Sequence, residues 1–176
     1  EFGFDRVYKQ GFNIKTPLNL NFQNIATKVL REGLINYDQR KGWRGPLANK
    51  TNLQNWNKDK SLKKFKLEKS INWELAIVKK INRFLIEIET EKKLKGKINY
   101  ENISWTKKEF KELVKVGDII YVKKLKNDVY ELKQLPKING GIVVMDPFTG
   151  RVLALSGGFS FKKSEFNRAS QALRQP

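Results

Sequence analysis

The chain has 176 residues, of which 39% are hydrophobic, and it carries a formal net charge of +18. This length can hold one domain, or one domain and part of another, and no apolar run approaches the roughly 20 residues that a membrane-spanning helix needs. The absence of Cys and His excludes disulfides, zinc sites of the usual ligand set and catalysis by a Ser–His pair or a His base. The chain begins at Glu1 without a recognisable targeting segment, so we expect it to be part of a longer protein.

The positive charge has two interpretations. A basic chain can bind nucleic acid or an anionic surface. However, Lys, Asn and Ile are all abundant here, as they are in proteins from genomes rich in A and T. Arg, which makes bidentate phosphate contacts, is much rarer than Lys. The composition therefore favours a genomic bias over a nucleic-acid partner.

The N-terminal segment predicts a short strand followed by a helix. Residues 11–16 alternate between apolar and polar side chains, which is typical of a strand. Asn19 or Asn21 can cap the helix that follows, and this helix is expected to end near Tyr37. The apolar positions at helical spacing are Phe22, Ile25, Ala26, Val29 and Leu30. A polar, Gly-containing stretch at 38–46 then marks a boundary.

The middle of the chain predicts a small β domain. Residues 47–70 are polar, rich in Lys and without a clear period, and we predict a loop or an irregular approach to the strands there. Short apolar segments then follow at a spacing of about ten residues, which is typical of strands joined by turns. The predicted strands are 73–77, 84–88, 96–100, 119–122 and 129–132. Five strands within about 90 residues fit an OB-like barrel.

A separate hairpin is predicted after Gly140. Residues 142–145 and 152–155 are apolar on both faces. Between them, Asp146 to Gly150 has the residues of a type I turn closed by a left-handed Gly. Strands that are apolar on both faces need cover on both, and the polar residues 156–176 cannot supply it. We therefore expect the hairpin to belong to a larger domain.

Three Ser residues precede a Lys at the spacing S-x-x-K, which serine acyl-enzymes use to place Lys beside the nucleophile. The pairs are Ser61–Lys64, Ser104–Lys107 and Ser160–Lys163. Because Lys is so frequent, roughly one such match is expected by chance. The companion motifs S-D-N and K-T-G are absent. We interpret all three matches as accidental.

Carboxylates and aromatic rings are the remaining candidates for functional residues. Glu87, Glu89 and Glu91 share one face at strand spacing, and a pair of carboxylates can perform acid–base chemistry. Because Lys and Arg residues surround them, we expect a solvated face instead. Aromatic rings of an OB-like barrel can stack on single-stranded nucleic acid. Because several of them fall on the apolar faces of their strands, we expect core packing instead. These rings are Trp73, Phe84, Trp105, Tyr121 and Tyr130.

The C-terminal residues resemble a known family. Gly141–Gly158, followed by Phe166–Pro176, resembles the start of the transpeptidase domain in class A (bifunctional) penicillin-binding proteins of the 1A type. In that family the run leads directly into G-S-x-F-K, which holds the nucleophilic Ser and its Lys. The resemblance implies that both lie beyond Pro176, so we expect no catalytic residue, cofactor site or metal site in this chain.

Other segments agree with this resemblance. Thr16–Asn19 with Gln23 is similar to the family's T-x-L-D…Q pattern, although Asn19 replaces the usual Asp. Val116–Asp118 and Leu132–Pro136 are similar to the end of the family's inserted OB-like domain. The resemblance is weakest at 47–115.

The resemblance implies a mainly β fold with one N-terminal helix, divided into three parts. Residues 1–42 are expected to be a linker strand and helix associated with the transpeptidase domain, and residues 43–137 an OB-like domain. Residues 138–176 are expected to be the N-terminal hairpin of the transpeptidase domain, ending before the catalytic Ser.

The resemblance also implies a role in cell-wall assembly at the periplasmic face of the bacterial inner membrane. The parent family joins a membrane-anchored peptidoglycan glycosyltransferase to a D-Ala-D-Ala transpeptidase that β-lactams acylate. This chain is expected to be a non-catalytic spacer within such a synthase and a docking module for regulators, such as an outer-membrane lipoprotein activator or other cell-wall proteins. The alternative is a free-standing OB-type protein that binds single-stranded nucleic acid.

Overall fold

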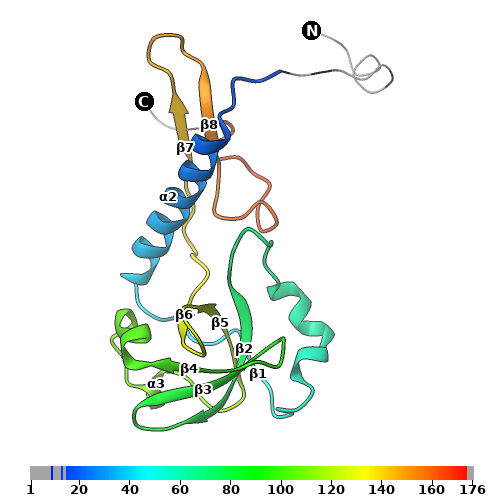
Figure 1. The fold of residues 1–176 in the computed structure, drawn as a ribbon, viewed down its shortest axis with the longest axis vertical. Coiled ribbons are helices and arrows are strands. Elements are labelled where there is room, and N and C mark those ends of the chain that lie inside the picture. The colour runs from blue at the N-terminus through cyan, green and yellow to red at the C-terminus, as the bar shows by residue number, and fades with distance from the viewer. Residues whose placement is uncertain (1–8, 10–12, 14, 174–176) are drawn as a thin grey trace.

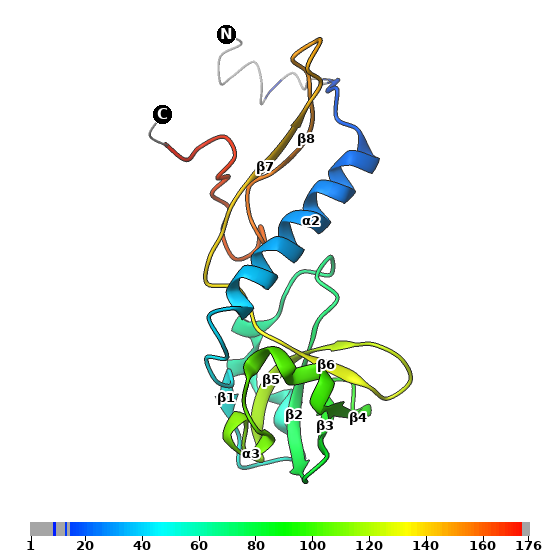
Figure 2. The ribbon, with the colours of Figure 1, turned by 90° about the vertical axis from the view of Figure 1, so that its left-hand side faces the viewer.

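The computed structural model describes Lys9, Asn13 and residues 15–173. These residues form two parts stacked along the long axis of the molecule (Figure 1). One part is a long helix beside a β-hairpin, and the other is the β-rich region that the chain enters after the helix and leaves before the hairpin. The helix and the hairpin, which are distant in sequence, therefore lie side by side, as Figure 2 shows from a second direction.

Helix α2 spans Leu20–Gln39. Its N-cap is Asn19, whose side-chain oxygen accepts hydrogen bonds from the backbone N–H of Asn21 at 3.0 Å and of Phe22 at 3.2 Å, satisfying two donors that a helix start leaves free. The predicted helix is confirmed, with Asn19 rather than Asn21 as the cap. No helix among the described residues is both long and apolar enough to cross a membrane.

The strand predicted over 11–16 is not present at Asn13, Lys15 or Thr16, which have no regular structure. The rest of that prediction lies outside the described residues. Alternation over so few residues is a weak signal, because a strand also needs a partner.

The β-rich region is a six-stranded antiparallel sheet with the order β1-β5-β2-β3-β4, in which β6 also pairs with β5. The strands are β1 (Ala48–Asn49), β2 (Glu74–Ile81), β3 (Leu85–Thr90), β4 (Lys95–Asn99), β5 (Asp118–Lys124) and β6 (Tyr130–Lys133). β1 pairs with the first half of β5 and β6 with the second half. The five predicted strands correspond to β2–β6, and the OB-like fold is confirmed.

The sheet curls until β4 meets β6. Lys97 and Val129 form a parallel bridge, and the N–H of Lys97 donates to the carbonyl oxygen of Asp128 at 2.8 Å. The neighbouring Gly96 makes this approach possible, because a Cβ there would overlap the ring of Tyr130, which is only 1% exposed. A glycine in a strand often marks such a close contact.

Two hydrophobic cores lie on opposite sides of the sheet. The inner core includes Ala76, Val78, Ile88, Ile98 and Ile120. It is closed by the 3₁₀ helix η3 (Tyr100–Thr106) and the short helix α3 (Phe110–Leu113), which contribute apolar side chains to it. The outer core includes Trp56, Leu62, Leu75, Ile77, Ile119 and Tyr121. β2 and β5 are apolar at consecutive positions because both of their faces are covered.

The prediction of a loop over 47–70 was wrong in part. This segment contains β1 and two 3₁₀ helices, η1 (Trp56–Lys58) and η2 (Lys60–Phe65). Its buried residues Trp56 and Leu62 cover the outer face of the sheet. Short 3₁₀ helices have no 3.6-residue period, so two isolated apolar residues among many Lys gave no pattern in the sequence.

The hairpin consists of β7 (Ile142–Met145) and β8 (Val152–Ser156). The predicted turn is present: the Asp146 carboxylate accepts from the N–H of Phe148 at 2.9 Å, and Gly150 has φ 69°. Contrary to expectation, cover for one face comes from within the chain, because α2 packs against β8 and Ala154 is fully buried. On the other face Val143 and Met145 are 42% and 54% exposed.

Candidate functional site

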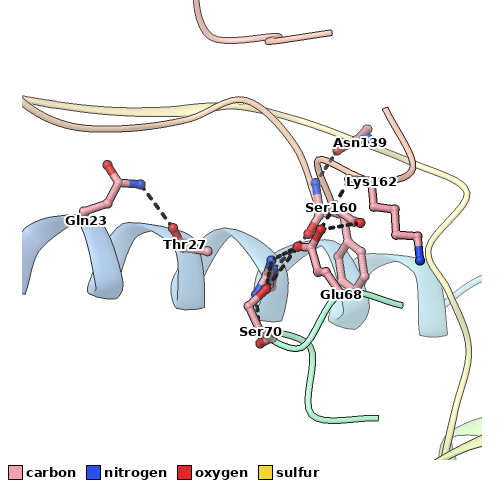
Figure 3. Close-up of polar contacts among 9 residues, drawn as sticks. Gln23, Thr27, Glu68, Ser70, Asn139, Ser160 and Lys162 are labelled. Carbon is pink, nitrogen blue, oxygen red and sulfur yellow. Dashed lines mark hydrogen bonds and ion pairs between the residues drawn. The ribbon is translucent and has the colours of Figure 1, made fainter. Parts of the chain in front are cut away.

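Arg31 of α2 contacts both the β-rich region and the segment after β8. Figure 3 shows Glu68, Ser70 and Ser160, which belong to these two segments, close together beside the helix. Its guanidinium donates to the carbonyl oxygen of Phe159 at 2.9 Å and to that of Ser70 at 3.1 Å, and forms an ion pair of 2.5 Å with Glu68. Arg suits this position because its planar group can donate in several directions at once. We call Arg31, Glu68, Ser70, Phe159 and Ser160 the Arg31 junction.

Glu68 extends the Arg31 junction to the segment after β8. Its second carboxylate oxygen accepts from the hydroxyl of Ser160 at 3.0 Å and from the N–H of Lys162 at 3.3 Å. The ring of Phe159, which is buried, packs beside Trp73 with 5.6 Å between centroids. Polar and apolar contacts therefore both join the segment 68–73 to the segment after β8.

The surroundings of Glu68 favour its charged form. Partial burial disfavours the charge, but hydrogen bonds from Lys162, Ser160 and Ser70 and the charge of Arg31 outweigh it, so the pKa of Glu68 lies below its usual value. A carboxyl whose pKa is lower in the folded state stabilises the fold above its unfolded-state pKa, and this contribution is lost as the pH falls through the folded-state pKa.

We expect Glu68→Gln to lower stability at pH 7 and to flatten its pH dependence. Between about pH 5 and the lower folded-state pKa of Glu68, the unfolding midpoint in urea should fall less steeply for the variant than for the unsubstituted chain. Glu112→Gln removes the same charge from an exposed position of α3 and is the control. If the unfolding midpoint falls equally steeply with pH in the Glu68 variant and in the unsubstituted chain, this account is contradicted.

A second junction is centred on Asp38, which is 2% exposed. Its carboxylate accepts hydrogen bonds from Arg44 at 2.9 Å, from the side-chain amide of Gln134 at 2.9 Å and from the N–H of Lys137 at 3.0 Å. Gln134 in turn accepts from the N–H of Arg44 at 2.8 Å. The Asp38 junction thus joins the end of α2 to the segments that lead into and out of the β-rich region.

The other end of α2 is fixed to β8. The side chain of Gln23 accepts from the N–H of Leu155 and donates to its carbonyl oxygen, both at 3.0 Å. The N–H of Asn19 donates to the carbonyl oxygen of Leu153 at 2.8 Å. These contacts occupy the edge of β8 as a neighbouring strand would.

Comparison with known proteins decides the family. The model for the penicillin-binding protein OB-like domain matches residues 43–138. The chain belongs to the family of penicillin-binding proteins that carry this OB-like domain. It is 39% identical to penicillin-binding protein 1A of Rickettsia prowazekii over 98% of this chain and 31% identical to that of Pseudomonas aeruginosa over 97% of it. The crystal structure of penicillin-binding protein 1A from Haemophilus influenzae matches with a TM-score of 0.72 and 33% identity, over 91% of this chain and 24% of that one.

The chain spans about a fifth of the length of these relatives, with 22% of the Rickettsia protein covered. The match includes the OB-like domain, although residues 47–115 resembled the family only weakly in the sequence analysis. The similarity therefore supports the resemblance seen at the C-terminal residues and extends it to the middle of the chain.

Among the described residues, no side-chain hydrogen bond joins the Ser and the Lys of any of the three pairs, although the backbone N–H groups of Lys107 and Lys163 donate to the carbonyl oxygens of Ser104 and Ser160. Ser160 donates to Glu68, while the ammonium of Lys163 donates to the carbonyl oxygen of Lys64 at 2.8 Å. The hydroxyl of Ser104 donates to the carbonyl oxygen of Glu101 at 3.0 Å.

The hydroxyl of Ser61 lies 3.3 Å from the ammonium of Lys50 rather than that of its paired Lys64. Each of the three Ser hydroxyls therefore has a polar contact outside its S-x-x-K pair.

We expect that a fluorescent penicillin will not acylate the 176-residue chain. Acylation requires a Ser activated by a general base and held against an oxyanion site, and the family motif that supplies them is expected after Pro176. Gel fluorescence should show no labelled band, whereas a chain extended through the transpeptidase domain should label under the same conditions. Stoichiometric labelling that disappears in Ser160→Ala would reveal a nucleophile in this region.

Glu87, Glu89 and Glu91 are half-buried, so this face is less solvated than expected. Glu89 accepts from the indole N–H of Trp56 at 3.1 Å and pairs with Lys93 at 3.3 Å. Glu91 pairs with Lys66 at 3.1 Å. The segment that carries η1 and η2 provides Trp56 and Lys66, and its cover of the sheet explains the difference. Glu87 lies opposite Lys97 of β4.

The pKa of Glu89 argues against acid catalysis at this face. Partial burial opposes its charge, but hydrogen bonds from Trp56 and Lys93, together with the charges of Lys79 and Lys93, lower the pKa. A general acid needs a raised pKa. The described residues also contain no group of three His, Cys, Asp or Glu that could hold a metal ion.

The five aromatic residues singled out in the sequence differ in their exposure. Tyr121 and Tyr130 are 3% and 1% exposed, which confirms core packing for both, whereas Phe84 is 77% exposed and that expectation was wrong for it. Phe84 immediately precedes β3. Trp73 and Trp105 are half-buried.

Proposed function

We propose that this region is a non-catalytic spacer of a bifunctional peptidoglycan synthase. Its proposed task is to hold the OB-like domain, residues 43–137, at a fixed position relative to a transpeptidase domain that includes residues 138–176. Residues 1–42 are the proposed linker from the glycosyltransferase side. The reactive Ser is proposed to follow Pro176, and the synthase to act at the periplasmic face of the inner membrane.

The observation that carries this proposal is the pair of junctions on α2. The two junctions lie at different positions along the helix. The Asp38 junction ties it to the segments that enter and leave the OB-like domain, and the Arg31 junction ties it to Glu68 and Ser70 within that domain and to the segment after β8. A single flexible connection would allow rotation, whereas two separate points of attachment restrict it. Phe159 and Ser160 precede the residues that the family uses for acylation. The Arg31 junction is therefore well placed to set the position of those acylation residues.

The test replaces residues 43–137 of the full-length synthase with a flexible Gly/Ser linker of matched span. We expect glycan polymerisation to continue, while cross-linking of the newly made strands decreases. Binding of fluorescent penicillin reports whether the transpeptidase itself remains folded. Unchanged cross-linking in a protein that binds penicillin normally would rule out the spacer role.

We also propose that the OB-like domain docks a regulator, such as a cell-wall protein or an outer-membrane lipoprotein. Support comes from Phe84, which is largely exposed and has the Arg83 guanidinium 6.0 Å from its ring centre. An exposed aromatic beside an Arg is typical of residues that contribute strongly to protein interfaces.

The alternative of a free-standing nucleic-acid binder has less support. It would need several exposed rings along a basic groove, but Tyr121 and Tyr130 are buried in the two cores. The family of the chain also gives no reason to expect such a ligand.

A further inference from the structure

A cleft of about 630 Å³ lies between the C-terminal end of α2 and the end of η3. It is larger than the cavities of about 270 and 360 Å³ beside Arg31. Its lining includes Asn36, Gln39, Arg40, Lys41, Trp105 and Lys107. The two walls therefore come from the linker helix and from the OB-like domain.

The lining contains three cations and neither Asp nor Glu. Arg40, Lys41 and Lys107 take no part in the ion pairs found among the described residues. By contrast, both cavities beside Arg31 include Glu side chains. A concave surface lined by charges of one sign concentrates counter-ions, so this cleft is suited to an anion.

Two of the cations are held by an aromatic ring. The guanidinium of Arg40 lies 4.9 Å and the ammonium of Lys41 5.8 Å from the ring centre of Tyr37. Cation–π contacts of this kind position a charge and leave its N–H donors available. The negative end of the α2 dipole also favours cations here. Lys107 reaches the cleft from a backbone with φ 55° at the end of η3.

The uncharged residues narrow the class of ligand. Asn36 and Gln39 offer amide donors and acceptors, and Trp105 offers a large, partly apolar wall, a combination that is common in sites for polar organic ligands. Arg40 can bind a carboxylate through two parallel hydrogen bonds. We propose that the cleft binds carboxylate-bearing glycopeptides of peptidoglycan. The choice of this ligand rests on the proposed function, whereas the anionic preference rests on the lining alone.

The test titrates the 176-residue chain with a disaccharide-tetrapeptide by calorimetry, at low and at physiological salt. Arg40→Gln/Lys107→Gln should weaken binding by about tenfold or more, since a hydrogen bond to a charged group contributes about 1.5 to 3 kcal/mol. Lys124→Gln/Lys126→Gln removes the same charge from exposed positions around the β5–β6 turn and should change binding less than about twofold. Amidation of the ligand's carboxylates should weaken binding as strongly as the cleft substitutions.

Three results would overturn the proposal: no binding to the unsubstituted chain, equal losses in the two double variants, or equal affinity for the amidated ligand. Inorganic phosphate is the second probe, and tighter binding of phosphate than of the glycopeptide would identify the cleft as a general anion site and overturn the choice of ligand. A failure here leaves the spacer role intact, because that role is tested separately by replacement of the OB-like domain in the full-length synthase.

Discussion

Asp38→Ala is expected to lower the free energy of unfolding of the chain by about 3 to 5 kcal/mol, the usual range when one partner of a buried ion pair is removed. The carboxylate is 2% exposed and accepts hydrogen bonds from Arg44, Gln134 and the backbone of Lys137. Without it, Arg44 and Gln134 would each lose one acceptor and keep only the carbonyl oxygens of Leu135 and Gly42, and the N–H of Lys137 would lose its acceptor. Urea unfolding followed by circular dichroism measures the change.

The matched control is Asp128→Ala. Asp128 also forms an ion pair, with Lys97 at 3.3 Å, but its side chain is 54% exposed. Exposed ion pairs contribute about 0 to 1 kcal/mol, so this variant should remain close to the unsubstituted chain. If both substitutions cost the same, the Asp38 junction does not hold the two parts of the molecule together.

Trp56→Ala is expected to cost about 3 to 5 kcal/mol, as is typical when a buried large aromatic side chain is truncated. Trp56 is 2% exposed, fills the outer core and donates its indole N–H to Glu89 at 3.1 Å. The substitution would leave a cavity between η1 and the sheet and remove a hydrogen bond from a partly buried carboxylate. Chemical unfolding gives the change in stability.

Two further variants separate these effects. Trp56→Phe keeps most of the apolar contact but loses the donor to Glu89, and should cost less than Trp56→Ala. Phe84→Ala truncates an aromatic ring that is 77% exposed and should change stability by only about 0.5 kcal/mol or less. A mild effect of Trp56→Ala would mean that the segment 47–70 is dispensable for the domain.

Much of the β fold could be predicted from the sequence because its strands carry strong local signals. β3 alternates buried and half-buried residues along its length, and the turn from Asp146 to Gly150 has the residues that its geometry demands. Asn19, a preferred N-cap residue, likewise indicates where α2 begins. These features depend on a few neighbouring residues, so a single sequence is enough to show them.

The junctions could not be predicted, because they depend on residues far apart in the chain. Asp38 stood in a polar stretch that indicated only a boundary, and its partner Gln134 lies 96 positions away. Glu68 and Trp56 belong to a segment whose 3₁₀ helices leave no period. The Lys-rich composition further obscured which charges are paired, since ion pairs such as Arg31–Glu68 have no local signature.

The spacer role is tested most directly by the distance between the OB-like domain and the hairpin. The sequence has no Cys, so Lys124→Cys and Phe148→Cys, both at exposed positions, provide two unique sites for spin labels. Double electron–electron resonance should give one narrow distance distribution, which should broaden when Arg31→Ala and Asp38→Ala are introduced together. A broad distribution already present with Arg31 and Asp38 intact would show that the two parts move independently, and would contradict the account.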